Sequence, residues 1–271
     1  MLLLTPTRMR IALISDVHAN LPALDAVLDD IAARGDADAT YHLGDLVGYA
    51  PWPNEVVARV RARHIAGVAG NYDSTVATDY KHCGCRYDDP RQEELSHVSY
   101  EWTRRHVTPE TKRSLAELPF RMDVRPAGGH TAGATLVLVH GAPTLNTVYW
   151  TDDRSDDFCA KMIAGAGVRH GDLLAFGHTH VPWTRTVGGV HLVNTGSVGR
   201  PKDGDSRACY AIVELDPARA ATIEFRRVAY DVDRAVAAID ASGLPREFGE
   251  HLRTGGRSSA TGGAKSEPLP A

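Results

Sequence analysis

Five short apolar runs in this chain end abruptly in Asp, Asn or His, and this feature constrains the fold more than any other. The runs are RIALIS, TYHL, HIAGVA, TLVLV and DLLAF, and the polar segments at their ends are SDVH, LGD, GNYD, VHG and GHTH. Short apolar runs of this kind are typical of buried parallel strands. The carboxyl ends of parallel strands meet at one edge of a sheet, where ligand crevices form. The sequence therefore predicts a cluster of polar side chains at such an edge.

Helical patterns between these runs indicate an alternation of strands and helices. Apolar residues recur with helical spacing from Leu24 to Ile31, and PNEVVARVRAR has a second such pattern. Further helices are predicted at 91–105, 109–117, 155–167 and 231–242, with a loop over 74–92 and hairpins over 183–194 and 208–231. The first hairpin is predicted to turn at Gly188-Gly189. The alternation predicts an α/β fold with a buried, mostly parallel sheet.

One domain accounts for most of the chain. We predict a single domain over residues 1–252, with residues 1–8 flexible. Residues 253–271 are rich in Gly, Ser and Pro and lack apolar periodicity. Because such a segment cannot bury enough apolar surface to become ordered, we predict a disordered tail there.

Charge and cysteine content exclude several classes of protein. The formal net charge is −4, which gives no reason to expect a nucleic-acid groove or a membrane-binding face. The four cysteines are too sparse for a disulfide-stapled secreted fold, and Cys83 and Cys85 are predicted to be reduced thiols in a loop beside the pocket. No secretory signal and no membrane-spanning run is visible. We predict a cytoplasmic protein, and association with further copies of the chain remains open.

The polar residues at the strand ends form a set that suits metal ions. They are two carboxylates, one amide and four imidazoles: Asp16, His18, Asp45, Asn71, His140, His178 and His180. Such groups bind divalent transition metals without any thiolate. Seven ligands are too many for one ion, whereas two ions could share a bridging carboxylate. Two divalent ions with two carboxylates and a hydroxide leave a net charge of about +1, which attracts a phosphate group.

The same segments resemble the signature blocks of the calcineurin-like metallophosphoesterases. The resemblance covers DVH, GDLVGY, GNYD, VHG and GHTH, over about residues 10–215. SDVHANLPAL and NTGSVGRPKDGDSRA are similar to the small prokaryotic phosphodiesterase branch, related to diadenosine-tetraphosphatase-like proteins. The resemblance implies a four-layer αββα sandwich of two mixed β-sheets flanked by helices. It also implies the ligand sets: Asp16, His18 and His180 for one metal, Asn71, His140 and His178 for the other, and Asp45 as the bridge.

The resemblance further implies a dinuclear-metal-dependent phosphoesterase. The leading hypothesis is a phosphodiesterase that hydrolyses a small phosphodiester or nucleotide, with a metal-bridging hydroxide attacking phosphorus. Asp45, Asn71 and His140 are then the predicted catalytic residues. Manganese, iron, zinc, cobalt and nickel all suit these ligands. A phosphomonoesterase or phosphoprotein phosphatase with the same centre, and a non-catalytic scaffold of the same fold, remain as alternatives.

Four residues are candidates for contact with a phosphate-ester substrate: Asn20, Asn71, Tyr72 and Arg200. Many members of the resembled family carry a histidine in the position of Tyr72. A phenol with a reference pKa near 10 is at most a hydrogen-bond donor at neutral pH, so help for the leaving group is open. Asn20 could contact phosphate or cap the first helix, and Arg200 could form two hydrogen bonds with a phosphate. Asp73 is predicted to support the ligands by hydrogen bonds or to form a turn, rather than to bind a metal.

Overall fold

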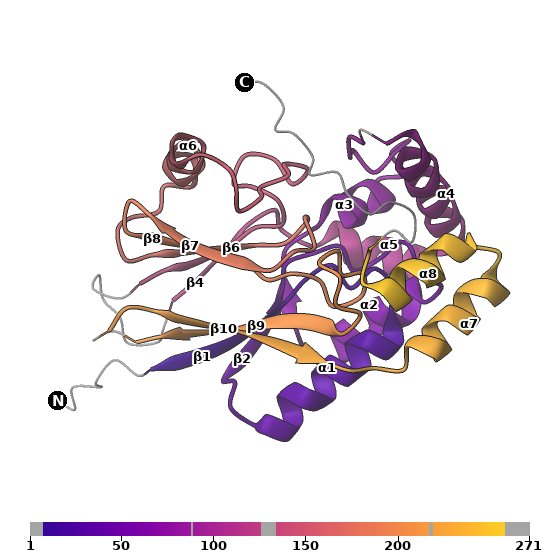
Figure 1. The fold of residues 1–271 in the computed structure, drawn as a ribbon, viewed down its shortest axis with the longest axis horizontal. Coiled ribbons are helices and arrows are strands. Elements are labelled where there is room, and N and C mark those ends of the chain that lie inside the picture. The colour runs from indigo at the N-terminus through magenta and orange to yellow at the C-terminus, as the bar shows by residue number, and fades with distance from the viewer. Residues whose placement is uncertain (1–7, 88, 126–133, 217–218, 258–271) are drawn as a thin grey trace.

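The computed structural model describes residues 8–87, 89–125, 134–216 and 219–257. These residues form two five-stranded sheets (Figure 1). The first sheet has the order β10 (Thr222–Val228), β9 (Ala208–Leu215), β1 (Met9–Ile14), β2 (Ala39–His42) and β3 (Ala66–Gly67). The second has the order β4 (Met122–Val124), β5 (Leu136–Leu138), β6 (Leu173–Phe176), β8 (Val190–Asn194) and β7 (Trp183–Val187).

Both sheets are mixed. In the first sheet β1, β2 and β3 are parallel, with Leu13 opposite Tyr41, while β9 and β10 run antiparallel. In the second sheet β5, β6 and β8 are parallel, with Phe176 opposite Asn194, while β4 and β7 are antiparallel edge strands. The predicted parallel strands are therefore correct, but they are divided between two sheets.

The described helices flank the pair of sheets. They are α1 (Leu21–Arg34), α2 (Pro53–Ala62), α3 (Asn71–Ala77), α4 (Pro90–His106), α5 (Pro109–Ala116), α6 (Asp156–Ala166), α7 (Val232–Ser242) and α8 (Arg246–Thr254). Figure 1 shows α6 on the outer side of the second sheet and α1 on the outer side of the first. The helices α4, α7 and α8 lie together at one end of the molecule.

Alternation of side chains along the strands produces three apolar layers. On β1, Ile11 and Leu13 pack between the two sheets, whereas Ala12 and Ile14 pack against the helices of the first sheet. On β6, Leu174 belongs to a third cluster that includes residues of α6. Successive residues of a strand point to opposite faces, so a strand that is buried on both faces contributes to two layers. The four-layer αββα arrangement is thereby confirmed.

Three elements differ from the sequence-based expectations. The short helix α3 begins at Asn71, inside a region that was expected to be strand end and loop, and β4 and α8 were not expected. A helix of seven residues is too short to show an apolar period, so α3 left no clear sequence signal. The predicted disordered tail begins inside α8, which ends at Thr254. The remainder of that tail, from residue 258, and residues 1–7 lie outside the described residues.

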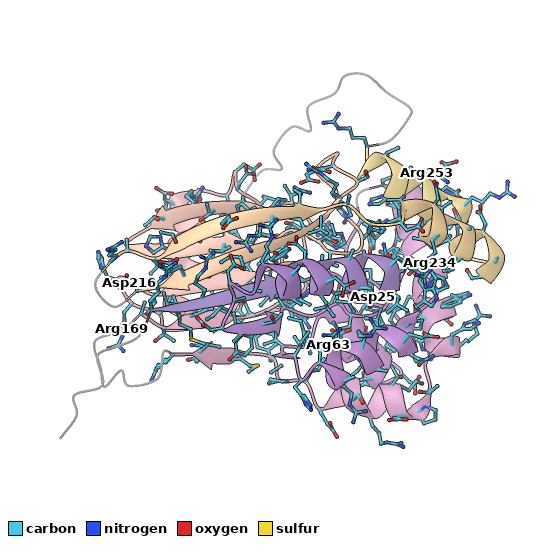
Figure 2. The ribbon with its side chains drawn as sticks, turned by 90° about the horizontal axis from the view of Figure 1, so that it is seen from below. Asp25, Arg63, Arg169, Asp216, Arg234 and Arg253 are labelled. Carbon is cyan, nitrogen blue, oxygen red and sulfur yellow. The ribbon has the colours of Figure 1, made fainter. Side chains whose placement is uncertain are left out.

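Charged side chains cover the outer faces of the helices and loops. Arg63, Arg169 and Arg234 project from the periphery in Figure 2, and all three are exposed. Within the described part of the chain, no helix has the length and apolar character required to cross a membrane.

Candidate metal centre

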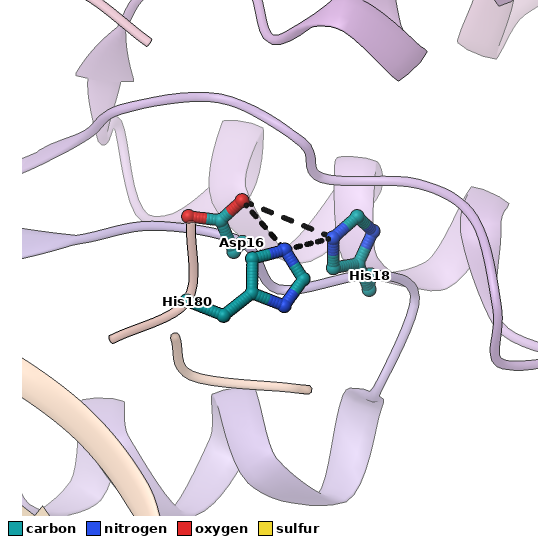
Figure 3. A group of neighbouring side chains, drawn as sticks. All are labelled: Asp16, His18 and His180. Carbon is teal, nitrogen blue, oxygen red and sulfur yellow. Dashed lines mark hydrogen bonds and ion pairs between the residues drawn. The ribbon is translucent and has the colours of Figure 1, made fainter. Parts of the chain in front are cut away.

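The structure brings the seven predicted ligands into one buried region between the ends of the two sheets. Each of them is at most 4% exposed. Asp16, His18 and His180 form one group, with His180 Nε2 3.2 Å from Asp16 Oδ1 and 3.0 Å from His18 Nε2 (Figure 3). Asp16 and His18 follow a strand of the first sheet, while His180 follows a strand of the second. Packing of the two sheets therefore completes this group.

A second group lies beside the first and contains Asp45, His140 and His178, whose ligand atoms lie within 4.8 Å of one another. His140 Nε2 is 3.4 Å from Asp45 Oδ2 and 3.2 Å from Asn71 Oδ1. Asp45 Oδ2 also lies 3.7 Å from His18 Nε2, in the first group. The Asp45 carboxylate thus stands between the groups, in the position that a bridging ligand requires.

Backbone carbonyl groups orient three of the imidazoles. His18 Nδ1 lies 3.1 Å from the oxygen of Val47, His140 Nδ1 lies 2.7 Å from that of Leu43, and His180 Nδ1 lies 2.6 Å from that of Arg200: each nitrogen is at hydrogen-bond distance. A carbonyl oxygen only accepts hydrogen bonds, so each Nδ1 carries a proton, and in the neutral ring the lone pair is then on Nε2. Partners of this kind are the usual supports of metal-binding histidines. Although burial opposes it, the neighbouring Asp45 carboxylate raises the pKa of His140 to about 9, so His140 has to lose its second proton before Nε2 can bind a metal.

Several of the candidate ligand atoms lack a hydrogen-bond partner among the described residues and are free to bind metal ions. The Nε2 lone pairs of His18 and His180 face each other at 3.0 Å. Asp16 Oδ1 and His178 Nε2 are buried and have no hydrogen-bond partner. Burial and the neighbouring His180 lower the pKa of His18 to about 3, and burial with the charge of His140 lowers the pKa of His178 to about 3. Neutral imidazoles, as at His18 and His178, and an unpartnered carboxylate oxygen are the state in which divalent metals bind such groups.

The backbone is strained at most of these positions. Five of the seven predicted ligands have left-handed φ angles, between 48° and 65°: Asp16, His18, Asp45, His178 and His180. Residues other than glycine rarely adopt this conformation, and it persists where the surrounding structure holds it. Such strain clusters at functional sites, which agrees with a role for these turns beyond connecting elements.

Two glycines of the signature blocks are required by close approach of the ligands. A Cβ atom on Gly177 would lie 2.4 Å from Asp16 Oδ2, and one on Gly70 would lie 2.1 Å from Asp45 Oδ1. Any side chain at either position would displace a carboxylate of the centre. The glycines in GHTH and GNYD are thus part of the site's geometry.

Asn71 and Asp73 have different functions within the first turn of α3. The side-chain amide of Asn71 donates to the Cys83 oxygen at 2.9 Å and to Cys85 Sγ at 3.2 Å, which turns its Oδ1 toward His140. The Asp73 carboxylate accepts from the backbone N–H groups of Leu46 and Gly70. It thus ties together the two turns that carry Asp45 and Asn71, as a turn-forming residue does. Cys83 and Cys85 are free thiols.

Tyr72 lines the centre, but its hydroxyl points away toward α4. The hydroxyl lies 3.3 Å from Ser96 Oγ and 3.4 Å from Ser99 Oγ, and the residue is 1% exposed. Burial raises the pKa of Tyr72 well above its ordinary value. The hydroxyl is therefore directed away from the ligand groups, and the contact of Tyr72 with a substrate stays a prediction.

The other two predicted substrate contacts have different surroundings. Asn20 is fully buried, its Oδ1 accepts from Ala23 N at 3.2 Å, and its amide donates to the Gly199 oxygen at 3.0 Å. Asn20 thus caps α1, which is one of the two roles expected for it, and its contact with phosphate stays a prediction. Arg200 lies beside the centre, with its guanidinium 4.0 Å from the centroid of the Tyr49 ring.

Several further residues surround the centre without having been predicted there. A small cavity of about 10 Å³ lies among the ligands, and its lining also includes Tyr49, Tyr87, Tyr149, Cys85 and Lys202. This volume suits ions or a single water rather than a substrate. Lys202 belongs to the NTGSVGRPKDGDSRA block, which was the available signal for it. A wider cavity of about 460 Å³ lies along β2 and contains none of the predicted ligands.

Comparisons with known proteins agree with this geometry. The sequence model of the calcineurin-like phosphoesterase superfamily domain matches residues 9–218. An uncharacterized protein of Methanocaldococcus jannaschii, MJ0912, is 31% identical over 266 residues, which cover 90% of this chain and 98% of that protein. A crystal structure of a metallophosphoesterase from Sphaerobacter thermophilus is 32% identical, with a TM-score of 0.69 over 92% of this chain and all of that one.

One further structure supports the fold alone. The crystal structure of the hypothetical protein PH1004 from Pyrococcus horikoshii has a TM-score of 0.76 over 92% of this chain and all of that chain. Its sequence identity is 21%. At this identity the agreement concerns the arrangement of sheets and helices.

Proposed function

Because this chain belongs to the calcineurin-like phosphoesterase superfamily, we propose that it is a dinuclear-metal-dependent phosphodiesterase acting on a small phosphodiester or nucleotide. The observation that carries the proposal is the pair of buried ligand groups on either side of Asp45. Asp16, His18 and His180 would hold one ion, and Asn71, His140 and His178 the other, with Asp45 shared between them. The site residues are proposed from their geometry.

Divalent ions in these positions supply an activated water and Lewis acidity toward the phosphoryl oxygens. The chain's own residues provide orientation and exclude bulk water. Carbonyl groups fix the tautomers of His18, His140 and His180, and the α3 turn fixes Asn71 beside His140. Burial of every ligand keeps competing water out of the inner positions. Preorganised groups of this kind need little rearrangement as charge develops on phosphorus.

The environment of Tyr72 supports a diester with a good leaving group. Its hydroxyl is directed to Ser96 and Ser99 and its pKa is raised by burial, so it does not act as the acid for a poor leaving group. A phosphomonoesterase or phosphoprotein phosphatase with the same centre is the alternative. A scaffold without activity would not need all seven ligand positions filled.

Hydrolysis of bis(p-nitrophenyl) phosphate and of p-nitrophenyl phosphate tests the proposal, with manganese, iron, zinc, cobalt and nickel added separately. We expect metal-dependent hydrolysis of the diester, with manganese as the first ion to test. Replacement of Asp45 by Asn should abolish it, whereas Asp157→Asn, on an exposed part of α6, should not. Activity on the monoester alone would overturn the diesterase assignment. An unchanged rate in Asp45→Asn would overturn the two-metal site.

We also propose a cytoplasmic location. It is supported by the four cysteines, which are all free thiols. Disulfides are rare in the reducing environment of the cytosol, and free thiols are common there.

A further inference from the structure

Arg200 is a buried cation without an anionic partner among the described residues. It is 5% exposed, and its guanidinium forms neither an ion pair nor a hydrogen bond with another described side chain. Its recorded side-chain contact is the ring of Tyr49, which it overlies at 4.0 Å from the centroid. By contrast, the comparably buried Arg226 is paired with Asp36 at 2.6 Å. Burial of a charge is costly unless a partner compensates it, so an anion at Arg200 is expected on physical grounds.

Lys202 supplies a second cation on the same side of the centre. It lines the cavity of the metal ligands, and no described carboxylate lies within ion-pair distance of it. Both residues are tied to His180. The Arg200 oxygen lies 2.6 Å from His180 Nδ1, and the backbone N–H of Lys202 donates to the His180 oxygen at 3.4 Å. The segment from Arg200 to Lys202, which orients His180, therefore also carries two positively charged side chains.

The carboxylates of the centre do not neutralise this pair. Asp16 Oδ1 and Asp45 Oδ2 face the histidines of the two groups. With metals in place, Arg200 and Lys202 would add two positive charges to a region that is already net positive by about one charge. A phosphodiester carries a single negative charge, so most of the positive charge of this region would stay uncompensated.

Arg200 also borders a space in which part of a ligand could lie. A cavity of about 220 Å³ between α4 and α8 is lined by Arg200, Arg91, His251 and Arg257. Glu247 and Glu250 belong to the same lining, and Glu247 is paired with Arg91. Arg200 therefore contacts Tyr49, which lines the cavity of the metal ligands, and also borders a second cavity large enough for a small chemical group.

We propose that Arg200 and Lys202 form a second anion subsite, and that the substrate is a phosphate ester with an additional phosphate or carboxylate next to the scissile group. This inference rests on the proposed function. The planar guanidinium can donate two parallel hydrogen bonds to such an anion, and the Tyr49 ring fixes its plane. Lys202 adds a point charge from the rim of the centre.

Calorimetric binding to the manganese-loaded full chain tests the subsite with three non-hydrolysable probes. Methylphosphonate has one anionic group, whereas methylenediphosphonate has a second phosphonate and phosphonoacetate a carboxylate. The measured quantity is the affinity ratio of each two-group probe to methylphosphonate. Free manganese is held constant, so chelation by a probe affects all variants equally. The more selective of the two probes identifies the second group as phosphate or carboxylate.

The variants are Lys202→Gln, Arg200→Gln and, as a control, Arg253→Gln. Arg253 is exposed near the end of α8 (Figure 2). It pairs with Asp233. We expect the affinity ratio for at least one two-group probe to fall about tenfold in Lys202→Gln and Arg200→Gln and to stay unchanged in Arg253→Gln. Lys202 is exposed, so its variant tests the subsite even if the buried Arg200 variant fails to fold. Equal losses for all three probes, or no loss in Lys202→Gln, would overturn the subsite.

The outcomes separate this inference from the proposed function. Diester hydrolysis by a protein whose Lys202→Gln variant keeps its affinity ratios would contradict the subsite alone. The chain could instead hydrolyse neither nitrophenyl ester while its affinity ratios still fall in Lys202→Gln and Arg200→Gln. That outcome would contradict the diesterase assignment alone.

Discussion

The Asp45 carboxylate accepts a hydrogen bond from the backbone N–H of Tyr72, with Oδ1 2.9 Å from the nitrogen. Its other oxygen faces His140 at 3.4 Å and His18 at 3.7 Å. One oxygen is thus held by the start of α3, and the other is directed between the two ligand groups. Because Tyr72 directly follows Asn71, the same turn positions the carboxylate of Asp45 and the side-chain amide of Asn71. The short helix α3 is therefore a structural support of the whole centre.

Replacement of Gly70 by Ala should disrupt metal binding. The new methyl group would lie 2.1 Å from Asp45 Oδ1 and 2.2 Å from the backbone nitrogen of Asp45, so the turn that carries this carboxylate would have to move. We expect manganese affinity to fall by about 10- to 100-fold, the range typical when the support of a ligand is lost. Metal content after dialysis measures this. Gly165→Ala, on α6, is the control, because its Cβ would meet only Thr144 at 3.4 Å. Full manganese occupancy in Gly70→Ala would contradict the close packing described above.

Removal of metal should destabilise the fold. Without an ion, the Nε2 atoms of His18 and His180 face each other at 3.0 Å and Asp16 Oδ1 lacks a partner. An ion that binds only the folded state adds about 3 kcal/mol when its concentration is 100 times the dissociation constant. We therefore expect the melting temperature to rise with added manganese and to fall with a chelator. In Asp16→Ala the rise should be much smaller, and an equal rise in that variant would place the ion elsewhere.

Replacement of Tyr72 by Phe should affect stability more than catalysis. The hydroxyl interacts with Ser96 and Ser99 of α4, so its loss should lower the free energy of unfolding by about 1 kcal/mol. Since the hydroxyl points away from the ligands, kcat for the diester should change by less than about threefold. Urea unfolding and steady-state kinetics measure the two effects. A fall in kcat larger than about tenfold would assign the hydroxyl a part in the reaction.

His42 should make the fold sensitive to acid. It is 1% exposed, and burial lowers its pKa from 6.5 to about 4. Between these values the unfolded chain binds a proton that the folded chain does not, so the free energy of unfolding falls as the pH drops. The loss should approach roughly 3 kcal/mol near pH 4. In His42→Leu the pH dependence between about 6.5 and 4 should be flatter by that amount, measured by urea unfolding of metal-free protein. His97→Leu, on the exposed face of α4, should keep the slope of the native chain.

Local patterns in the sequence were sufficient for most of the strands and helices and for the identity of the metal-centre candidates. Leu24 to Ile31 shows the helical period of α1, and Gly188-Gly189 marks the turn between β7 and β8. The candidate ligands are recognisable because each follows a buried strand, where a polar side chain would otherwise have no reason to be. These signals arise from residues that are close together in the sequence, so they can be recognised without knowledge of the tertiary structure.

The arrangement of the centre depended on contacts between distant residues. His180 reaches Asp16 only because the two sheets pack together, and the tautomer of His140 depends on the oxygen of Leu43, 97 positions away. The absence of a described anionic partner for Arg200 is also a property of the packed chain. A sequence pattern records which groups follow a strand. Which atoms of those groups face each other depends on how the sheets, turns and helices pack in three dimensions.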